Sequence, residues 1–149
     1  MNLAVKMFSG IVQEKGVINT LLQGNGHLII TVNCSKSFIK DKKIGDSVAV
    51  DGVCLTITEK NNHSLTFDAV NETLDRTIIK NYAVDSCVNL ESSLFFGGPV
   101  GGHLMSGHIH LRGLVKEVLI NGDSKDIVID TSSEWSKYLS EKGYIGING

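Results

Sequence analysis

The sequence predicts an all-β fold in which one module occurs twice. Most apolar segments are short, rich in β-branched residues and alternate with polar residues, as half-buried strands do. Glycine- and asparagine-rich turns separate these segments, and short strands at this spacing indicate a small sandwich or barrel. A constant offset of 97 positions also relates the beginning of the chain to its end, which indicates duplication.

Five strands and one helix are predicted in the first part of the chain. The strands are expected at residues 15–22, 27–32, 47–50, 53–59 and 64–69, with turns at 24–26, 44–46 and 60–62. In the strand VCLTIT, the alternation places Cys54, Thr56 and Thr58 on one face and Leu55 and Ile57 on the other.

The helix is predicted over residues 71–79, where NETL begins with a favourable N-cap residue, Asn71. Asp68 and Glu72 lie at this strand-to-helix junction. Capping and interaction with the helix dipole explain such carboxylates as well as a functional role does.

The internal repeat aligns short blocks at the same offset without a gap. Ser9-Gly10 matches Ser106-Gly107, residues 15–17 match 112–114, residues 30–32 match 127–129, and residues 48–52 match 145–149. Most apolar positions in these blocks match apolar positions, and glycines match at Gly10, Gly16 and Gly52. We therefore interpret the chain as two copies of a β module.

The two copies differ in how far they continue. Gly52 leads into VCLTIT, whereas its counterpart Gly149 is the last residue. We expect residues 1–97 to form a complete first barrel and residues 98–149 the first half of a second barrel. Half a barrel leaves strand edges unpaired and apolar faces in water. The chain is therefore expected to be a fragment, or a product that needs a partner to close it.

Composition narrows the class of protein. Fourteen Lys and Arg against sixteen Asp and Glu give a net charge of −2, and no polybasic run occurs, so a nucleic acid or an anionic membrane is not the expected partner. No apolar run is long enough for a membrane span, and no secretory signal is recognisable. Three widely spaced cysteines indicate reduced thiols in a cytoplasmic protein.

The densest polar motif is GGHLMSGHIH at residues 101–110. His108 and His110 would share a side if this segment were a strand, but no Cys or Glu has a matching ligand spacing, so no metal is expected. The alternative for both is a surface histidine or a hydrogen-bonded core histidine. Cys54 is equally explained as a small buried apolar residue.

Five motifs in order resemble one family. These are MFSGIV (7–12), DGVCLTIT (51–58), DAVNETLDR (68–76), GGHLMSGHIH (101–110) and KGYIGING (142–149). Together they resemble riboflavin synthase, the lumazine-binding duplicated-barrel family, from Met7 to Gly149. The resemblance implies two similar six-stranded Greek-key barrels, the second truncated in this chain, and a carboxy-terminal helix that holds a homotrimer together in the full-length protein.

The resemblance also implies an activity. Riboflavin synthases move a four-carbon unit between two molecules of 6,7-dimethyl-8-ribityllumazine, which gives riboflavin and 5-amino-6-ribitylaminouracil, without a redox cofactor or a metal. The fragment alone is expected to bind the ligand with little turnover. Two alternatives remain: a non-catalytic lumazine- or flavin-binding antenna protein, and an oligosaccharide- or nucleic-acid-binding barrel. The second lacks the basic and aromatic strips such barrels use.

By resemblance, the catalytic residues are His108, Cys54, Ser47 and Thr56. The substrate-binding residues are Phe8, Gly10, Ile11, Val12, Cys54, Leu55, Thr56, Asp68, Ala69, Val70, Asn71, Glu72, Thr73, Gly107, His108, Ile109 and Lys142. In this assignment residues 10–12 and 54–56 enclose one lumazine in the first barrel, and residues 107–109 with Lys142 face the other.

Overall fold

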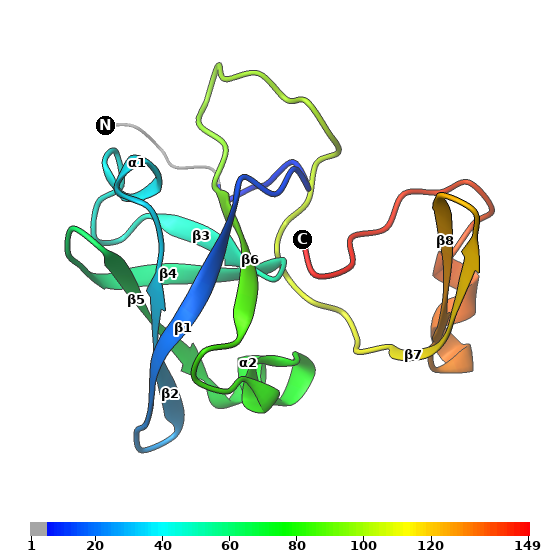
Figure 1. Ribbon diagram of the computed structural model, residues 1–149, viewed down its shortest axis with the longest axis horizontal. Coiled ribbons are helices and arrows are strands. Elements are labelled where there is room, and N and C mark those ends of the chain that lie inside the picture. The colour runs from blue at the N-terminus through cyan, green and yellow to red at the C-terminus, as the bar shows by residue number, and fades with distance from the viewer. Residues whose placement is uncertain (1–5) are drawn as a thin grey trace. The chain divides into compact units, whose positions relative to one another are not determined.

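The structure is a computed structural model that describes residues 6–149 (Figure 1). It divides into two compact units, which are described separately. One contains the residues up to Ile109 together with Gly146–Gly149, and the other contains His110–Ile145. Among the described residues, no helix combines the length and the apolar character needed to cross a bilayer.

The larger unit is built on a closed antiparallel barrel of six strands. The strands are β1 (Glu14–Gln23), β2 (His27–Asn33), β3 (Ser47–Val50), β4 (Val53–Lys60), β5 (Ser64–Val70) and β6 (Cys87–Ser92). Their order around the barrel is β1-β2-β5-β4-β3-β6, a Greek-key arrangement. The five strands predicted from alternation are confirmed, and β6 closes the barrel between β1 and β3.

Alternation along each strand fills the barrel interior. Val53, Leu55 and Ile57 of β4 are buried in the core, whereas the side chains between them are half-buried on the outside, as VCLTIT predicts. The largest fully buried side chains of the barrel core are Ile18, Ile30, Val32, Val48, Val50, Ile57, Leu65, Phe67, Ile79, Val88 and Leu90. Burial of these side chains supplies the main driving force for folding.

The helices of this unit are short. Helix α1 (Lys36–Ile39), which alternation does not predict, begins at the cap residue Ser35, whose hydroxyl accepts a hydrogen bond from Phe38 N at 3.1 Å. Phe38 and Ile39 of this helix pack against the barrel core.

The predicted helix 71–79 is wrong in its extent and its cap. Helix α2 (Asn71–Arg76) ends at extended Thr77, and the 3-10 helix η1 (Ile79–Asn81) follows it. Asn71 is the first helical residue, and the cap position before it is Val70, which has no side-chain cap.

The smaller unit contains the hairpin of β7 (Leu114–Asn121) and β8 (Ser124–Asp130), followed by the 3-10 helix η2 (Ser133–Tyr138). Its register reproduces that of β1 and β2 97 positions earlier: Val17 opposes Asn33 and Leu114 opposes Asp130. The register shifts between Ile18 and Thr20 in β1 and between Val115 and Glu117 in β7. The two hairpins therefore share one pairing pattern, down to the irregularity.

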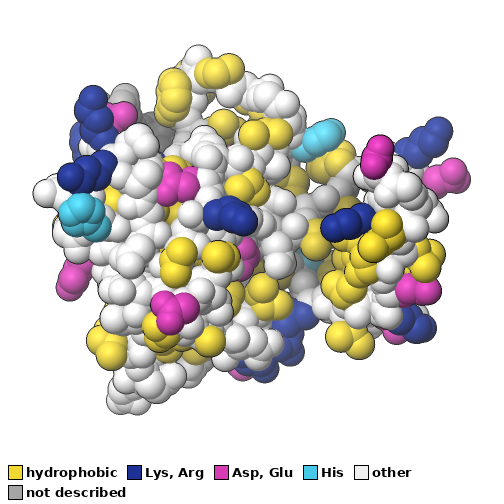
Figure 2. Space-filling view, viewed as in Figure 1, with side chains coloured by type: hydrophobic (Ala, Val, Ile, Leu, Met, Phe, Trp, Pro, Cys, Tyr) yellow, Lys and Arg dark blue, Asp and Glu magenta, His cyan; other side chains and the backbone are white. Residues whose placement is uncertain are grey.

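The β7–β8 hairpin presents apolar side chains to solvent. Figure 2 shows hydrophobic side chains gathered on this unit. Among its exposed large hydrophobic residues are Leu114, Val115, Val118, Leu119, Ile120, Ile127 and Val128. In the first barrel the hairpin with the same register turns its apolar positions into a closed core.

We expect Gly16→Ala to destabilise the first barrel by about 1–3 kcal/mol. A Cβ atom at Gly16 would lie 2.5 Å from Val32 Cγ1 and 2.8 Å from Leu90 Cδ1, inside a filled core. Urea unfolding measures the effect. Gly101→Ala is the matched control, because an added Cβ there meets nothing within 4 Å, so its change should stay within about 0.5 kcal/mol. Equal stabilities of the two variants would contradict this account.

Candidate functional site

Three predicted catalytic residues of the first barrel share one patch outside its sheet. The register places Ser47 opposite Thr56, and Ala49 opposite both Cys54 on β4 and Glu91 on β6. Residues directly opposite one another project to the same face of a sheet. We call these five residues the outer patch. Ser47, Ala49 and Glu91 are buried although they lie outside the barrel, so other segments must cover the patch.

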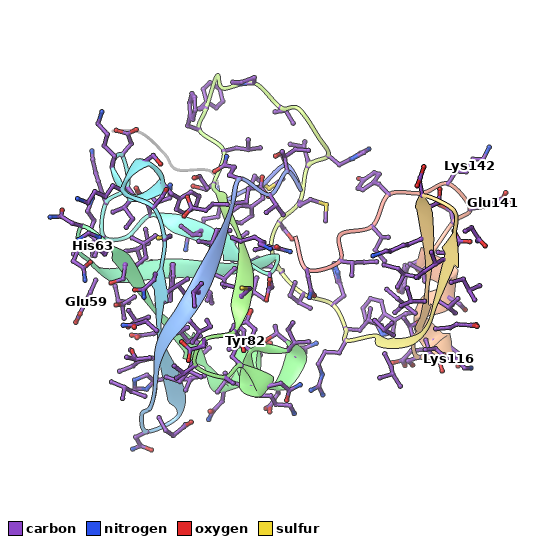
Figure 3. The ribbon with its side chains drawn as sticks, viewed as in Figure 1. Glu59, His63, Tyr82, Lys116, Glu141 and Lys142 are labelled. Atoms are coloured by element: carbon purple, nitrogen blue, oxygen red, sulfur yellow. The ribbon has the colours of Figure 1, made fainter. Side chains whose placement is uncertain are left out.

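A two-residue turn fixes the start of β4 and with it Cys54. Asp51 and Gly52 join β3 to β4 with φ values of 47° and 79°, the backbone of a type I′ hairpin that favours Asp-Gly. Asp51 Oδ1 accepts a hydrogen bond from Asn89 N at 2.7 Å, and Oδ2 accepts one from the Tyr82 hydroxyl at 2.8 Å. Figure 3 shows Tyr82 beside β6. The turn is therefore anchored to β6 and to the chain after η1.

A covering segment, residues 103–109, lies against the outer patch. Cys54 N donates a hydrogen bond to Gly107 O at 2.9 Å. Gly107 has a φ of +72°, and a Cβ atom there would lie 2.7 Å from Cys54 Cβ and 2.8 Å from Phe8 Cε2. Only glycine meets both conditions, the left-handed backbone and the close approach.

This contact joins two residues that the resemblance assigns to different lumazines. Gly107, which the resemblance implies faces the other lumazine, contacts Cys54 of the first barrel. Its ligand assignment stays a prediction. Gly10, the counterpart of Gly107 in the repeat, has a matching φ of +73°. Ile11 and Val12 after it are exposed. The contact between Cys54 and Gly107 joins residues far apart in the sequence, so local sequence patterns do not encode it.

The covering segment pairs with the beginning of the described chain. Phe8 N donates to Met105 O at 2.7 Å, Met105 N donates to Phe8 O at 3.0 Å, and His103 N donates to Ser9 O at 2.9 Å. Phe8 is 1% exposed, so the predicted pocket residue Phe8 lies under the covering segment rather than open to solvent.

The patch continues toward β5 and α2. Ile57 opposes Phe67, and one residue beyond this pair lie Thr56 on β4 and exposed Asp68 on β5. Polar groups thus border the outer patch on this side. Of the remaining predicted residues, Val70, Asn71 and Glu72 are exposed and Thr73 is half-buried.

Two predicted substrate-binding side chains point into the barrel core and not toward the outer patch. Leu55 and Ala69 are buried in the barrel core, so at these positions only backbone groups are available to a ligand. The alternation of a strand explains this, because every second side chain of a lining strand turns inward.

His108 and Ile109 complete the covering segment. The side chain of His108 is exposed, and Ile109 packs against the barrel core. The segment forms a single bridge at Met105 rather than a strand, so the shared strand face considered for His108 and His110 does not arise. Lys142 belongs to the smaller unit, where it is exposed with a φ of 57°.

Sequence reasoning missed three residues that organise the site: Glu91, Asp51 and Tyr82. Asp51 carried a signal, since Asp-Gly between two alternating segments is typical of a hairpin turn. Within residues 6–149, no three His, Cys, Asp or Glu side chains gather closely enough to hold a metal ion. The three cysteines are unpaired thiols, and burial raises the pKa of Cys34 to about 11.

We expect Tyr82→Phe to lower stability at neutral pH and to flatten its decline in alkali. Burial, then the charge of Asp51 and its hydrogen bond, raise the pKa of Tyr82 above its ordinary value of about 10. Stabilisation from the neutral phenol is thus complete below about pH 10 and is lost as the pH rises further. Phenylalanine loses the bond, at about 0.5–1.5 kcal/mol, but does not titrate.

Urea unfolding of both proteins from neutral pH to about pH 11 measures this difference. The titration of Cys34 is common to both, so it does not affect the comparison. Parallel stability curves for the two proteins would show that Tyr82 is not linked to folding.

Comparison with known proteins identifies the family of the chain. The family model described as lumazine binding domain matches residues 9–93. Riboflavin synthase of Photobacterium phosphoreum is 38% identical over 143 residues, covering 96% of this chain and 66% of the relative. Riboflavin synthase of Chlamydia pneumoniae is 42% identical over 144 residues, covering 96% of this chain and 70% of the relative. The chain thus spans about two thirds of the length of these relatives.

Solved structures of LumP share the fold. The complex of LumP with riboflavin superimposes with a TM-score of 0.85 at 23% identity, over 95% of this chain and 76% of that chain. The complex with 6,7-dimethyl-8-(1'-D-ribityl) lumazine gives 0.83 at 22% identity, over 95% and 75%. The fold, the family match and the relatives agree, and the chain belongs to the riboflavin synthase family of lumazine-binding proteins.

Proposed function

We propose that this chain carries the first lumazine-binding barrel of a riboflavin synthase, and that its outer patch and covering segment form the pocket. The enzyme would dismutate two molecules of 6,7-dimethyl-8-ribityllumazine to riboflavin and 5-amino-6-ribitylaminouracil. The observation that carries the proposal is the hydrogen bond from Cys54 N to Gly107 O, which places the segment bearing His108 beside the outer patch in a chain of this family.

The chemical character of the patch suits such a ligand. A pteridine is flat, with amide-like groups along one edge and a polyhydroxyl chain at N8. Small and polar side chains at Ser47, Cys54 and Thr56 leave room for a flat ring, and the backbone of an outer strand position offers donors and acceptors. Asp68, exposed on β5 beside the patch, and Asn71, exposed at the start of α2, are suited to the hydroxyls of a ribityl chain.

The reaction depends more on holding the two lumazines in the correct orientation than on strongly acidic or basic side chains. The electron-poor ring acidifies the C7 methyl group of lumazine, because the carbanion is delocalised into the ring. Holding two lumazines face to face can contribute about 7–11 kcal/mol. A positioned acid or base adds roughly 10²–10⁴-fold, and we assign that proton transfer to His108, with Ser47, Cys54 and Thr56 as relay or nucleophile-positioning groups.

The wider assignments rest on the same resemblance. We propose residues 1–97 and 98–149 as the two copies of a repeat, supported by the shared register of the β1–β2 and β7–β8 hairpins. Gly10, Ile11, Val12 and Lys142 remain proposed ligand-binding residues, although they are not part of the outer patch. The whole protein is proposed to be a cytoplasmic homotrimer without a cofactor, a nucleic-acid partner or a membrane partner.

A non-catalytic lumazine- or flavin-binding protein is the alternative. It is favoured by the likeness in fold to LumP, whose structures are described as complexes with a ribityllumazine and with riboflavin. Ser47, Cys54, Thr56 and His108 together in one sequence support the enzyme. Turnover separates the two functions, whereas binding does not.

The chain is expected to bind 6,7-dimethyl-8-ribityllumazine without added metal, and Gly107→Ala to weaken that binding by about tenfold or more. A Cβ atom at Gly107 would force apart Cys54 and Phe8. Fluorescence titration of the ligand gives both affinities. Gly97→Ala is the matched control, since Gly97 also has a positive φ, +84°, but an added Cβ meets nothing within 4 Å. A folded parent chain that does not change the fluorescence would refute the lumazine site.

His108→Ala should slow riboflavin formation by about 10²-fold while changing lumazine affinity by less than about threefold. A proton transferred only in the transition state contributes to turnover and not to ground-state binding. Riboflavin absorbance measures turnover on the product of the whole gene. His63→Ala is the control, because His63 is an exposed histidine in the turn between β4 and β5 (Figure 3). Unchanged turnover in His108→Ala would leave His108 without a catalytic role.

A further inference from the structure

We propose that Glu91 is a positioning residue that holds the covering segment over the outer patch and thereby sets the lumazine pocket of the first barrel. Glu91 lies on β6, directly opposite Ala49, which in turn is opposite Cys54. Its side chain is on the outside of the barrel, yet the residue is only 2% exposed. A carboxylate in such a place needs hydrogen-bond donors, because an unpaired buried carboxylate is strongly unfavourable.

The donors all come from two consecutive residues. Glu91 Oε1 accepts hydrogen bonds from Ser9 N and from the Ser9 hydroxyl, both at 2.6 Å, and Oε2 accepts one from Gly10 N at 3.1 Å. Ser9 and Glu91 are 82 positions apart in the sequence. Three hydrogen bonds donated to one carboxylate fix both the position and the orientation of the Ser9-Gly10 backbone.

That backbone carries the covering segment. Ser9 O accepts the bond from His103 N at 2.9 Å, and Phe8 is joined to Met105 by two backbone bonds. The Phe8 ring lies within 2.8 Å of the place a Cβ of Gly107 would take, so it packs directly under that residue. A displacement of Ser9 is therefore transmitted to Gly107 through packed atoms and backbone bonds.

These contacts connect the sheet to the covering segment at two places. Glu91 binds Ser9 and Gly10 at one place, and Cys54 N donates to Gly107 O at the other. Cys54, Ala49 and Glu91 lie side by side on three adjacent strands, so both places are anchored in the same sheet. In the proposed pocket, which the outer patch and the covering segment form together, Glu91 sets how the segment lies against the sheet and does so without contacting the ligand.

Glu91→Gln tests this inference, which rests on the proposed lumazine site. Glutamine has the same shape but replaces one acceptor oxygen by an NH₂ donor, which cannot accept from Ser9 or Gly10. Two quantities are measured on the whole chain: amide hydrogen exchange at Cys54, which needs no ligand, and lumazine affinity by fluorescence. Glu59→Gln, an exposed carboxylate on β4, is the matched control.

We expect Glu91→Gln to speed exchange of the Cys54 amide by about tenfold or more, to leave the β2–β5 ladder amides unchanged, and to weaken lumazine binding by a similar factor. A role in overall stability alone would instead raise exchange across the whole barrel. The control should change neither quantity.

Unchanged Cys54 exchange in a folded Glu91→Gln protein overturns the proposal, and so does faster exchange with unchanged lumazine affinity. If Glu91→Gln does not fold, Ser9→Ala removes the hydroxyl bond to Glu91 Oε1 together with the 3.3 Å bond that Ser9 Oγ accepts from Ile11 N, and keeps the two backbone bonds to Glu91. This variant must show the same local changes at a smaller size, and their absence overturns the proposal equally. If the parent chain does not bind lumazine, the proposed function fails, whereas Cys54 exchange still decides whether Glu91 holds the segment.

Discussion

The hydrogen bond between Cys54 N and Gly107 O is the contact on which the rest of the site depends. A small barrel normally meets solvent with a polar exterior, but here Ser47 and Ala49 of β3 and Glu91 of β6 are buried outside the core, beside half-buried Cys54 and Thr56 of β4. Such a patch is stable only under a cover. The covering segment provides it, and glycine at position 107 lets two backbones approach within hydrogen-bonding distance of each other.

The barrel itself could be predicted from the sequence because its signals are local. Alternation in VCLTIT assigns Cys54 and Thr56 to the outside and Leu55 to the core, as the structure has them. The 97-position offset carries the same hairpin register to Leu114 and Asp130. Strand β6 has a weaker pattern, and it is recognised from the topology it closes. The helix after β5 is shorter than its sequence suggests because Thr77 turns extended and its hydroxyl donates to Thr73 O at 2.7 Å.

Motifs single out the residues of the candidate site, but they do not indicate which of these residues meet in space. Motifs identify Cys54 and Gly107 separately, and nothing between them in the sequence says that they touch. The partners of Glu91 are hidden for the same reason, since a glutamate near the end of a strand resembles any surface residue until its donors, 81 and 82 positions away, are known. Asp51 is intermediate: its turn is encoded locally by Asp-Gly, whereas its bonds to Asn89 and Tyr82 depend on the closed barrel.

Because Phe8 pairs with Met105, the site is completed only after the barrel has folded. All six barrel strands lie between Glu14 and Ser92, so during synthesis the barrel can close before the covering segment has left the ribosome. Contacts of long sequence separation form late because their loop-closure entropy is large. A newly made barrel therefore passes through a state with a finished core and an uncovered outer patch. In that state the small, polar make-up of the patch limits aggregation, which an apolar surface of the same size would promote.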